Sequence, residues 1–101
     1  MFYFYIIYSK TAGRFYIGHA ADPWLKLMQH NTNSVEKYTG KNTDWELKAV
    51  FEVAYSKEEA DQLEKFIKKQ KSRKLVLKLI DPDFKPAGEL NGLVRVSHVR
   101  D

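Results

Sequence analysis

The first segment of the chain constrains the fold most strongly. Residues 2–8 read FYFYIIY, and a run of aromatic and β-branched side chains favours a strand that is buried on both faces. Turn-forming residues follow at 9–13, and residues 14–18, RFYIG, have the composition of a second strand. The two segments therefore predict a β-hairpin that contributes the first two strands of a sheet.

A helix is predicted directly after this hairpin. Asp22 can accept hydrogen bonds from the free backbone N–H groups of a first turn, and Pro23 already has the φ angle of a first helical residue. We expect the helix to end near residue 31. At about 100° per residue, one side should hold Trp24, Leu25 and Met28, with Leu27 near the margin, and the opposite side Lys26 and His30.

A polar segment, residues 31–44, separates this helix from the next apolar stretch. It is rich in Asn, Thr and Gly, which predicts a surface loop, and long loops are often functional. Lys37, Tyr38 and Lys41 form a basic and aromatic cluster within it. Together with Lys71, these side chains are candidates for contacts with a nucleic acid.

Alternation of apolar and polar residues then predicts a third strand over residues 45–53. One face of it should carry Trp45, Leu47, Ala49, Phe51 and Val53. Ser56 and Glu59 form a capping box that opens a helix near residue 57. A second helical piece should run from about Ser72 to Ile80.

The end of the chain is less regular. Asp81 and Pro82 stop the helix, and residues 93–99 alternate as in an added strand or a loose tail. With 101 residues, the chain is expected to form one small domain of the α/β (α+β) class. The predicted order is strand, strand, helix, strand, helix, in which a three-stranded, mainly antiparallel sheet is flanked by helices.

Composition narrows the classes of function. The net charge of +4 favours a polyanionic partner such as nucleic acid, but it also suits a basic surface kept for solubility. The absence of cysteine excludes a disulfide framework, a thiolate zinc finger and a cysteine nucleophile. No segment approaches the roughly 20 apolar residues of a membrane span, so we expect a soluble, cytoplasmic protein.

Glu64 is the first candidate for chemistry. It falls inside the apolar stripe that Ala60, Leu63 and Ile67 form on the helix that starts near residue 57. A carboxylate that points at a sheet is costly to desolvate unless it is paired or bound to a cation. Glu64 is therefore either a residue at the edge of the stripe, bonded to a tyrosine or lysine, or a ligand for Mg²⁺ or Mn²⁺.

Two further groups have open interpretations. Tyr3, Tyr5 and Tyr16 lie on adjacent predicted strands, where their hydroxyls either converge on one site or are simply those of aromatic strand residues. Lys26 and His30 either present two groups to a phosphate or belong to a solvated face. The sequence contains no glycine-rich phosphate loop, no paired catalytic carboxylates and no serine-centred elbow.

Five segments follow one another in an order found in a known family. They are Tyr3-Phe4-Tyr5, Tyr16-Ile17-Gly18, the helix ending in His30-Asn31, the segment Lys37-Tyr38-Thr39 before Trp45-Glu46-Leu47, and the run from Glu64 to Lys74. In this order they resemble the GIY-YIG nuclease superfamily, particularly its small stand-alone bacterial domains. The resemblance covers about residues 2–80. We therefore expect a nuclease-like domain over residues 1–80 and a C-terminal extension of unknown role over residues 81–101.

The resemblance implies an endonuclease that hydrolyses DNA phosphodiester bonds with the help of Mg²⁺ or Mn²⁺. By position, Glu64 would hold the metal ion, and Tyr5 would assist deprotonation of the attacking water. Tyr16 would position water or phosphate, and His30 would orient a tyrosine or contact the phosphate. Structured or damaged DNA is one expected substrate.

One departure from the family concerns Lys26, which stands where the family has an arginine that stabilises the transition state. Lysine keeps the charge but lacks the planar fork that matches two phosphate oxygens, and loss of a well-placed donor commonly costs about 10²–10³ in rate. The first triplet, Tyr3-Phe4-Tyr5, also lacks its glycine. Three functions stay open: an attenuated endonuclease, a catalytically inactive nucleic-acid-binding module of the same fold, and a protein-interaction domain.

Overall fold

The computed structural model describes residues 2–32, 44–53, 57–70, 73–85 and 93–96, with only the backbone described at residue 60. Its elements are the strands β1 (Phe2–Ser9), β2 (Arg14–Ala20), β3 (Trp45–Val53) and β4 (Leu93–Val96) and the helices α1 (Pro23–Asn31), α2 (Lys57–Gln70) and α3 (Arg73–Ile80). The predicted α+β class, an antiparallel sheet flanked by helices, is confirmed. Among the helices of the described residues, none combines the length and apolar character needed to cross a membrane.

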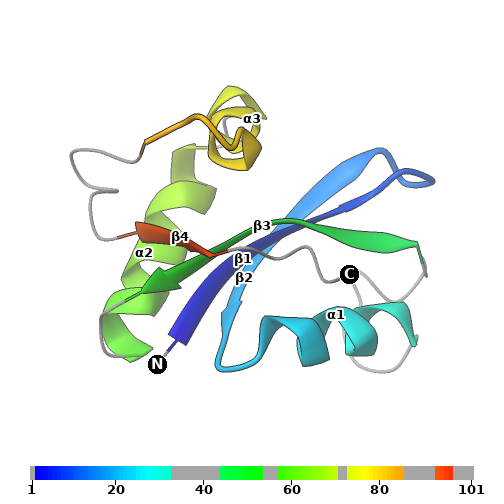
Figure 1. The fold of residues 1–101 in the computed structure, drawn as a ribbon, viewed down its shortest axis with the longest axis horizontal. Coiled ribbons are helices and arrows are strands. Elements are labelled where there is room, and N and C mark those ends of the chain that lie inside the picture. The colour runs from blue at the N-terminus through cyan, green and yellow to red at the C-terminus, as the bar shows by residue number, and fades with distance from the viewer. Residues whose placement is uncertain (1, 33–43, 54–56, 71–72, 86–92, 97–101) are drawn as a thin grey trace.

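The four strands form one antiparallel sheet in the order β2-β1-β3-β4 (Figure 1). β1 is therefore an inner strand, in which Tyr5 lies opposite Gly18 of β2 and opposite Val50 of β3. The hairpin turn closes with a hydrogen bond of 2.8 Å from Gly13 N to Ser9 O, and Gly13 has a φ of 65°, which favours glycine. In the described part of the chain, β2 forms one edge of the sheet.

A hydrophobic cluster lies on each face of the sheet. α2 and α3 cover one face, where the buried residues are Phe4, Ile6, Ile17, Ala49, Phe51, Val53, Ile67, Val76, Leu79 and Leu93. α1 covers the other face, where the buried residues are Tyr5, Ile7, Ala20, Trp45 and Val50. Because β1 contributes to both clusters, it is buried on both faces, as its sequence predicts.

The third strand has its predicted bounds, but the prediction that its apolar residues share one face was wrong. Ile6 pairs with Ala49 and the next residue, Ile7, pairs with Leu47, so Lys48 is an extra residue in β3. A bulge of this kind moves the residues beyond it to the opposite face. Trp45 and Leu47 consequently pack on the side of α1, and Ala49, Phe51 and Val53 on the side of α2 and α3.

α1 begins as predicted, but a different side of it faces the sheet. Asp22 Oδ1 accepts a hydrogen bond of 3.0 Å from Leu25 N, and Pro23 is the first helical residue. Leu25 and Met28 are 48% and 60% exposed, so two of the three residues predicted to form the apolar side lie in solvent, whereas the third, Trp24, packs inward. The inward side holds Pro23, Trp24, Leu27 and His30. The helix can bury this side because the imidazole of His30 finds a hydrogen-bond partner inside the fold.

The sheet has four strands rather than the predicted three, because residues 93–96 pair with β3. The alternating C-terminal stretch is thus an added strand in this range, and the rest of that stretch lies outside the described residues. Arg95 Nη2 donates to the backbone oxygen of Leu79 and, at 2.9 Å, to that of Asp81. The guanidinium therefore satisfies carbonyl groups at the C-terminal end of α3 and ties β4 to that helix.

Candidate active site

Tyr5 and His30 form a buried pair between β1 and α1. The Tyr5 hydroxyl lies 3.0 Å from His30 Nε2, and the two residues are only 2% and 3% exposed. Gly18 lies opposite Tyr5 in the sheet, and a Cβ atom at Gly18 would be 2.7 Å from the Tyr5 hydroxyl oxygen. The missing side chain at Gly18 therefore leaves the space in which the Tyr5 ring crosses β2 and reaches α1.

Tyr16 lies beside this pair on the edge strand. Its ring centroid is 5.0 Å from that of His30 and 6.5 Å from that of Tyr5. Tyr16 is half-buried, whereas Tyr5 is enclosed. Tyr3 lies on the same face but packs edge-on against Trp24. The fold thus brings Tyr5, Tyr16 and His30 together under α1, and Tyr16 is the tyrosine of this group that a dissolved molecule can reach.

Glu64 lies on the other face of the sheet, in a chain of polar contacts along α2. Its Oε1 is 3.1 Å from His19 Nδ1, and its Oε2 is 3.7 Å from Lys68 Nζ. The other ring nitrogen of His19, Nε2, lies 2.9 Å from Asp61 Oδ1. His19 on β2 is therefore held between two carboxylates of α2, and Glu64 is fixed against β2 by His19.

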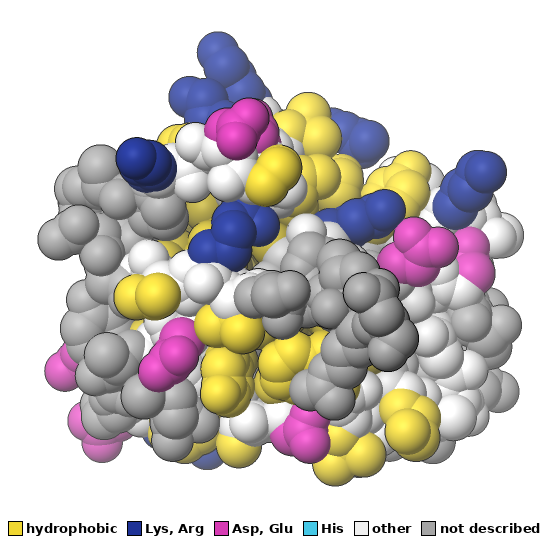
Figure 2. Space-filling model, in the orientation of Figure 1, with side chains coloured by type: hydrophobic (Ala, Val, Ile, Leu, Met, Phe, Trp, Pro, Cys, Tyr) yellow, Lys and Arg dark blue, Asp and Glu magenta, His cyan; other side chains and the backbone are white. Residues whose placement is uncertain are grey.

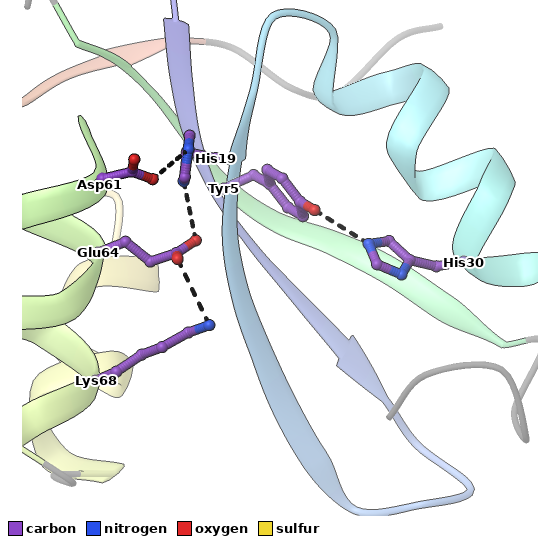
Figure 3. Close-up of polar contacts among 6 residues, drawn as sticks. All are labelled: Tyr5, His19, His30, Asp61, Glu64 and Lys68. Atoms are coloured by element: carbon purple, nitrogen blue, oxygen red, sulfur yellow. Dashed lines mark hydrogen bonds and ion pairs between the residues drawn. The ribbon is translucent and has the colours of Figure 1, made fainter. Parts of the chain in front are cut away.

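The edge strand β2 separates these two groups of side chains. Figure 3 shows the Tyr5–His30 pair on one side of β2 and the chain from Asp61 to Lys68 on the other. Lys68 reaches around the edge, since its Nζ lies 5.3 Å from the centroid of the Tyr16 ring. The candidate active site is therefore the surface around this edge of the sheet, with Tyr16 on one side and Glu64 on the other.

Of the other predicted site residues, only Lys26 lies in the described part of the chain. Lys26 is half-buried on α1, one turn before His30, and makes no ion pair with the described residues. All four residues predicted to contact nucleic acid lie outside the described residues, namely Lys37, Tyr38, Lys41 and Lys71. Their predicted role stays a prediction.

The donor at Glu64 fits a hard divalent ion. Mg²⁺ prefers oxygen ligands and is usually held by one or two carboxylates together with substrate phosphates and water. Glu64 offers one carboxylate, 18% exposed, beside the edge of β2. Among the side chains that the structure describes, no group of three or more His, Asp or Glu is arranged to hold a metal ion. A bound phosphate and water would therefore supply most of the ligands of an ion at this position.

His19 and Lys68 lie at the candidate site but were not predicted as site residues from the sequence. A signal for Lys68 is present in the sequence, because it follows Glu64 by four residues on a predicted helix and must lie on the same side of it. The sequence holds no such signal for His19, whose partner Glu64 lies 45 residues further along the chain. That contact depends on how α2 crosses β2, which the local pattern does not specify.

The fold and the order of its motifs place the chain among small nuclease domains. A family model described as the GIY-YIG catalytic domain matches residues 1–76, and the chain therefore belongs to the GIY-YIG family. No curated protein and no solved structure gives a significant match. The family consists of endonucleases that act on DNA and generally use divalent metal ions, so the match supports a nuclease activity in general.

Proposed function

We propose that this protein is a cytoplasmic, Mg²⁺- or Mn²⁺-dependent endonuclease that hydrolyses phosphodiester bonds in DNA. The observation that carries the proposal is the arrangement at the edge of the sheet, where Glu64 and Tyr16 lie on either side of the edge strand β2 and both contact Lys68. The family supports nuclease activity on DNA in general terms. The ion and the roles of the individual residues are our proposal.

Hydrolysis forms a bond from a water oxygen to phosphorus and breaks the bond from phosphorus to the leaving oxygen. A divalent ion bound at Glu64 would stabilise the negative charge on the phosphate and on the leaving oxygen. Tyr16 is half-buried at the edge of the sheet, and a phenol hydroxyl can both donate a hydrogen bond to a phosphate oxygen and accept one from water. Its proposed role is to position one of these two groups.

Tyr5 and His30 lie on the buried side of Tyr16, and their proposed role is to hold Tyr16 in position. Both are almost completely buried, so in this arrangement Tyr5 does not meet the attacking water directly. Its assistance to proton removal is therefore indirect. His30 fixes the orientation of the Tyr5 hydroxyl at 3.0 Å, and both rings pack near Tyr16 and set its position and surroundings. A rigid support of this kind is what a positioned catalytic group needs.

The proposal is tested by nicking of a supercoiled plasmid at low salt in Mg²⁺, Mn²⁺ or EDTA. We expect metal-dependent nicking by the wild type that Glu64→Ala lowers by about 10²-fold or more. Glu58→Ala is a matched control, since Glu58 is an exposed carboxylate in the first turn of the same helix. A Glu64→Ala protein that nicks as fast as the wild type would contradict the assigned mechanism.

Branched and damaged duplexes, compared with intact ones, would show whether structured or damaged DNA is preferred.

A catalytically inactive DNA-binding module is the second candidate function. It is favoured by Lys26, which replaces the bidentate arginine donor with a single ammonium group. This candidate predicts salt-sensitive DNA binding without metal-dependent cleavage, and no cleavage after Lys26→Arg. A domain that binds only proteins predicts, in contrast, no DNA affinity even at low salt.

A further inference from the structure

Lys68 differs from the neighbouring lysines of α2 in its contacts at the edge of β2. It follows Glu64 by four residues, so the two side chains lie on the same side of the helix. Its Nζ is 3.7 Å from Glu64 Oε2 and 5.3 Å from the centroid of the Tyr16 ring, and its side chain is 47% exposed. Lys68 therefore contacts both halves of the candidate site while its ammonium group stays open to solvent.

The sign of the charge along the chain changes near Lys68. Acidic residues lie in the first turn of α2, whereas the sequence from Lys65 to Ile80 contains no Asp or Glu. Figure 2 shows lysine and arginine side chains gathered over α3, where Arg73 and Lys78 are exposed. Lys68 thus belongs to a segment whose charge attracts a polyanion such as DNA.

We propose that Lys68 is a further catalytic residue, whose ammonium group binds a non-bridging oxygen of the DNA phosphate that is cleaved. The ammonium group carries three donors on a flexible stem, so it can turn from the Tyr16 ring and Glu64 toward a phosphate held between them. A charge-assisted hydrogen bond to the phosphate then stabilises the negative charge that builds up during hydrolysis. This proposal rests on the proposed function, because it assigns a role within that reaction.

The position of Lys68 also complements that of Lys26. Lys26 lies on α1, which covers one face of the sheet, and Lys68 comes from α2 on the other face. The two cations therefore come from helices on opposite faces of the sheet. Two ammonium groups can share the charge stabilisation for which a single bidentate arginine is otherwise used.

Single-turnover nicking at saturating protein tests this role, because it separates a loss in rate from a loss in DNA affinity. We expect Lys68→Ala to lower the rate at saturation by about 10²-fold, and Lys68→Arg to recover most of it. Lys65→Ala and Lys69→Ala are matched controls. Both remove one exposed positive charge from α2, but they lie about 100° and about 140° from Glu64 around the helix. They should change the rate at saturation by less than about 3-fold.

Three outcomes would overturn the proposal, each for a different reason. Equal effects of the three alanine variants would mean that Lys68 only contributes to the general attraction of DNA. A loss in Lys68→Ala that is restored by more Mg²⁺ would mean that Lys68 acts by holding Glu64 and does not touch the phosphate. Absence of nicking by the wild type in every metal would overturn the proposed function itself, whereas the first two outcomes leave that function standing.

Discussion

His19 Nδ1 lies 3.1 Å from Glu64 Oε1, so the carboxylate proposed to hold a metal ion is itself held by a residue of the edge strand. Asp61 contacts the opposite nitrogen of the same ring at 2.9 Å, which fixes the orientation of the imidazole. Partners of this kind keep a ligand in the rotamer that binds the ion, and their loss typically costs about 10–100-fold in metal affinity or activity. His19 is therefore a positioning residue in the proposed site.

The first prediction concerns this contact. In His19→Ala the Glu64 carboxylate loses its partner on β2, and we expect the Mg²⁺ concentration for half-maximal nicking to rise by about 10-fold or more. Asp61→Asn is the control, because it leaves the contact between His19 and Glu64 in place and should have a smaller effect. Titration of Mg²⁺ in the nicking assay measures both. An unchanged Mg²⁺ requirement in His19→Ala would show that His19 does not position Glu64.

A second prediction compares two glycines. A Cβ atom at Gly18 would lie 2.7 Å from the hydroxyl oxygen of Tyr5 and 2.9 Å from its Cζ, and the buried ring has little room to retreat. Gly18→Ala should therefore cost about 1–3 kcal/mol in the free energy of unfolding and should also abolish nicking, because Tyr5 moves away from His30.

Gly13→Ala serves as the control for this prediction. A Cβ atom at Gly13 meets nothing within 4 Å, but the φ of 65° is strained for alanine. We expect a loss of about 1–2 kcal/mol in stability with little change in nicking. Urea unfolding and the nicking assay together separate the two variants. If both variants lose stability and activity to the same extent, the close approach of Tyr5 to Gly18 has no special role.

A third prediction concerns Lys26, one turn before His30 on α1. Restoring the planar, bidentate guanidinium by Lys26→Arg should raise the single-turnover rate by about 10-fold or more, if the arginine position of the family is retained here. Lys10→Arg, an exposed position in the hairpin turn, is a control for a general effect of arginine on DNA binding. A rate that stays at the wild-type level would mean that Lys26 does not face the phosphate.

The parts of the fold that sequence predicts well are those with strong local signals. The aromatic hairpin, the cap at Asp22 and the bounds of β3 each follow from a few neighbouring residues, and the structure confirms them. The family was also recognisable, because Tyr16-Ile17-Gly18 and the segments around it keep their order.

The features that escaped prediction depend on contacts between distant elements. The extra residue Lys48 in β3 appears only when β3 is paired with β1, and alternation alone cannot locate it. The side that α1 buries depends on the hydrogen bond between His30 and Tyr5, a partner 25 residues away. The contact of His19 with Glu64 likewise depends on the packing of α2 against β2.

Asp44 links the hairpin turn to the start of β3. Its Oδ1 accepts a hydrogen bond of 2.6 Å from Ser9 Oγ, and its Oδ2 accepts bonds from Thr11 N at 2.9 Å and Thr11 Oγ1 at 2.8 Å. These donors favour the charged form of the carboxyl group. They lower the pKa of Asp44 from 3.8 to about 2, and the bond from Ser9 is the largest cause.

The last prediction follows from this shift in the pKa of Asp44. Because the folded pKa lies below the unfolded one, the contribution of Asp44 to stability is present above the unfolded value of 3.8 and is lost as the pH falls toward about 2. In urea unfolding from about pH 6 to about pH 2, the stability advantage of the wild type over Asp44→Asn should therefore shrink through this window. Ser9→Ala removes the main cause of the shift, so it should weaken the same pH dependence. Parallel curves for the wild type and Asp44→Asn would show that these hydrogen bonds do not hold Asp44 in its charged form.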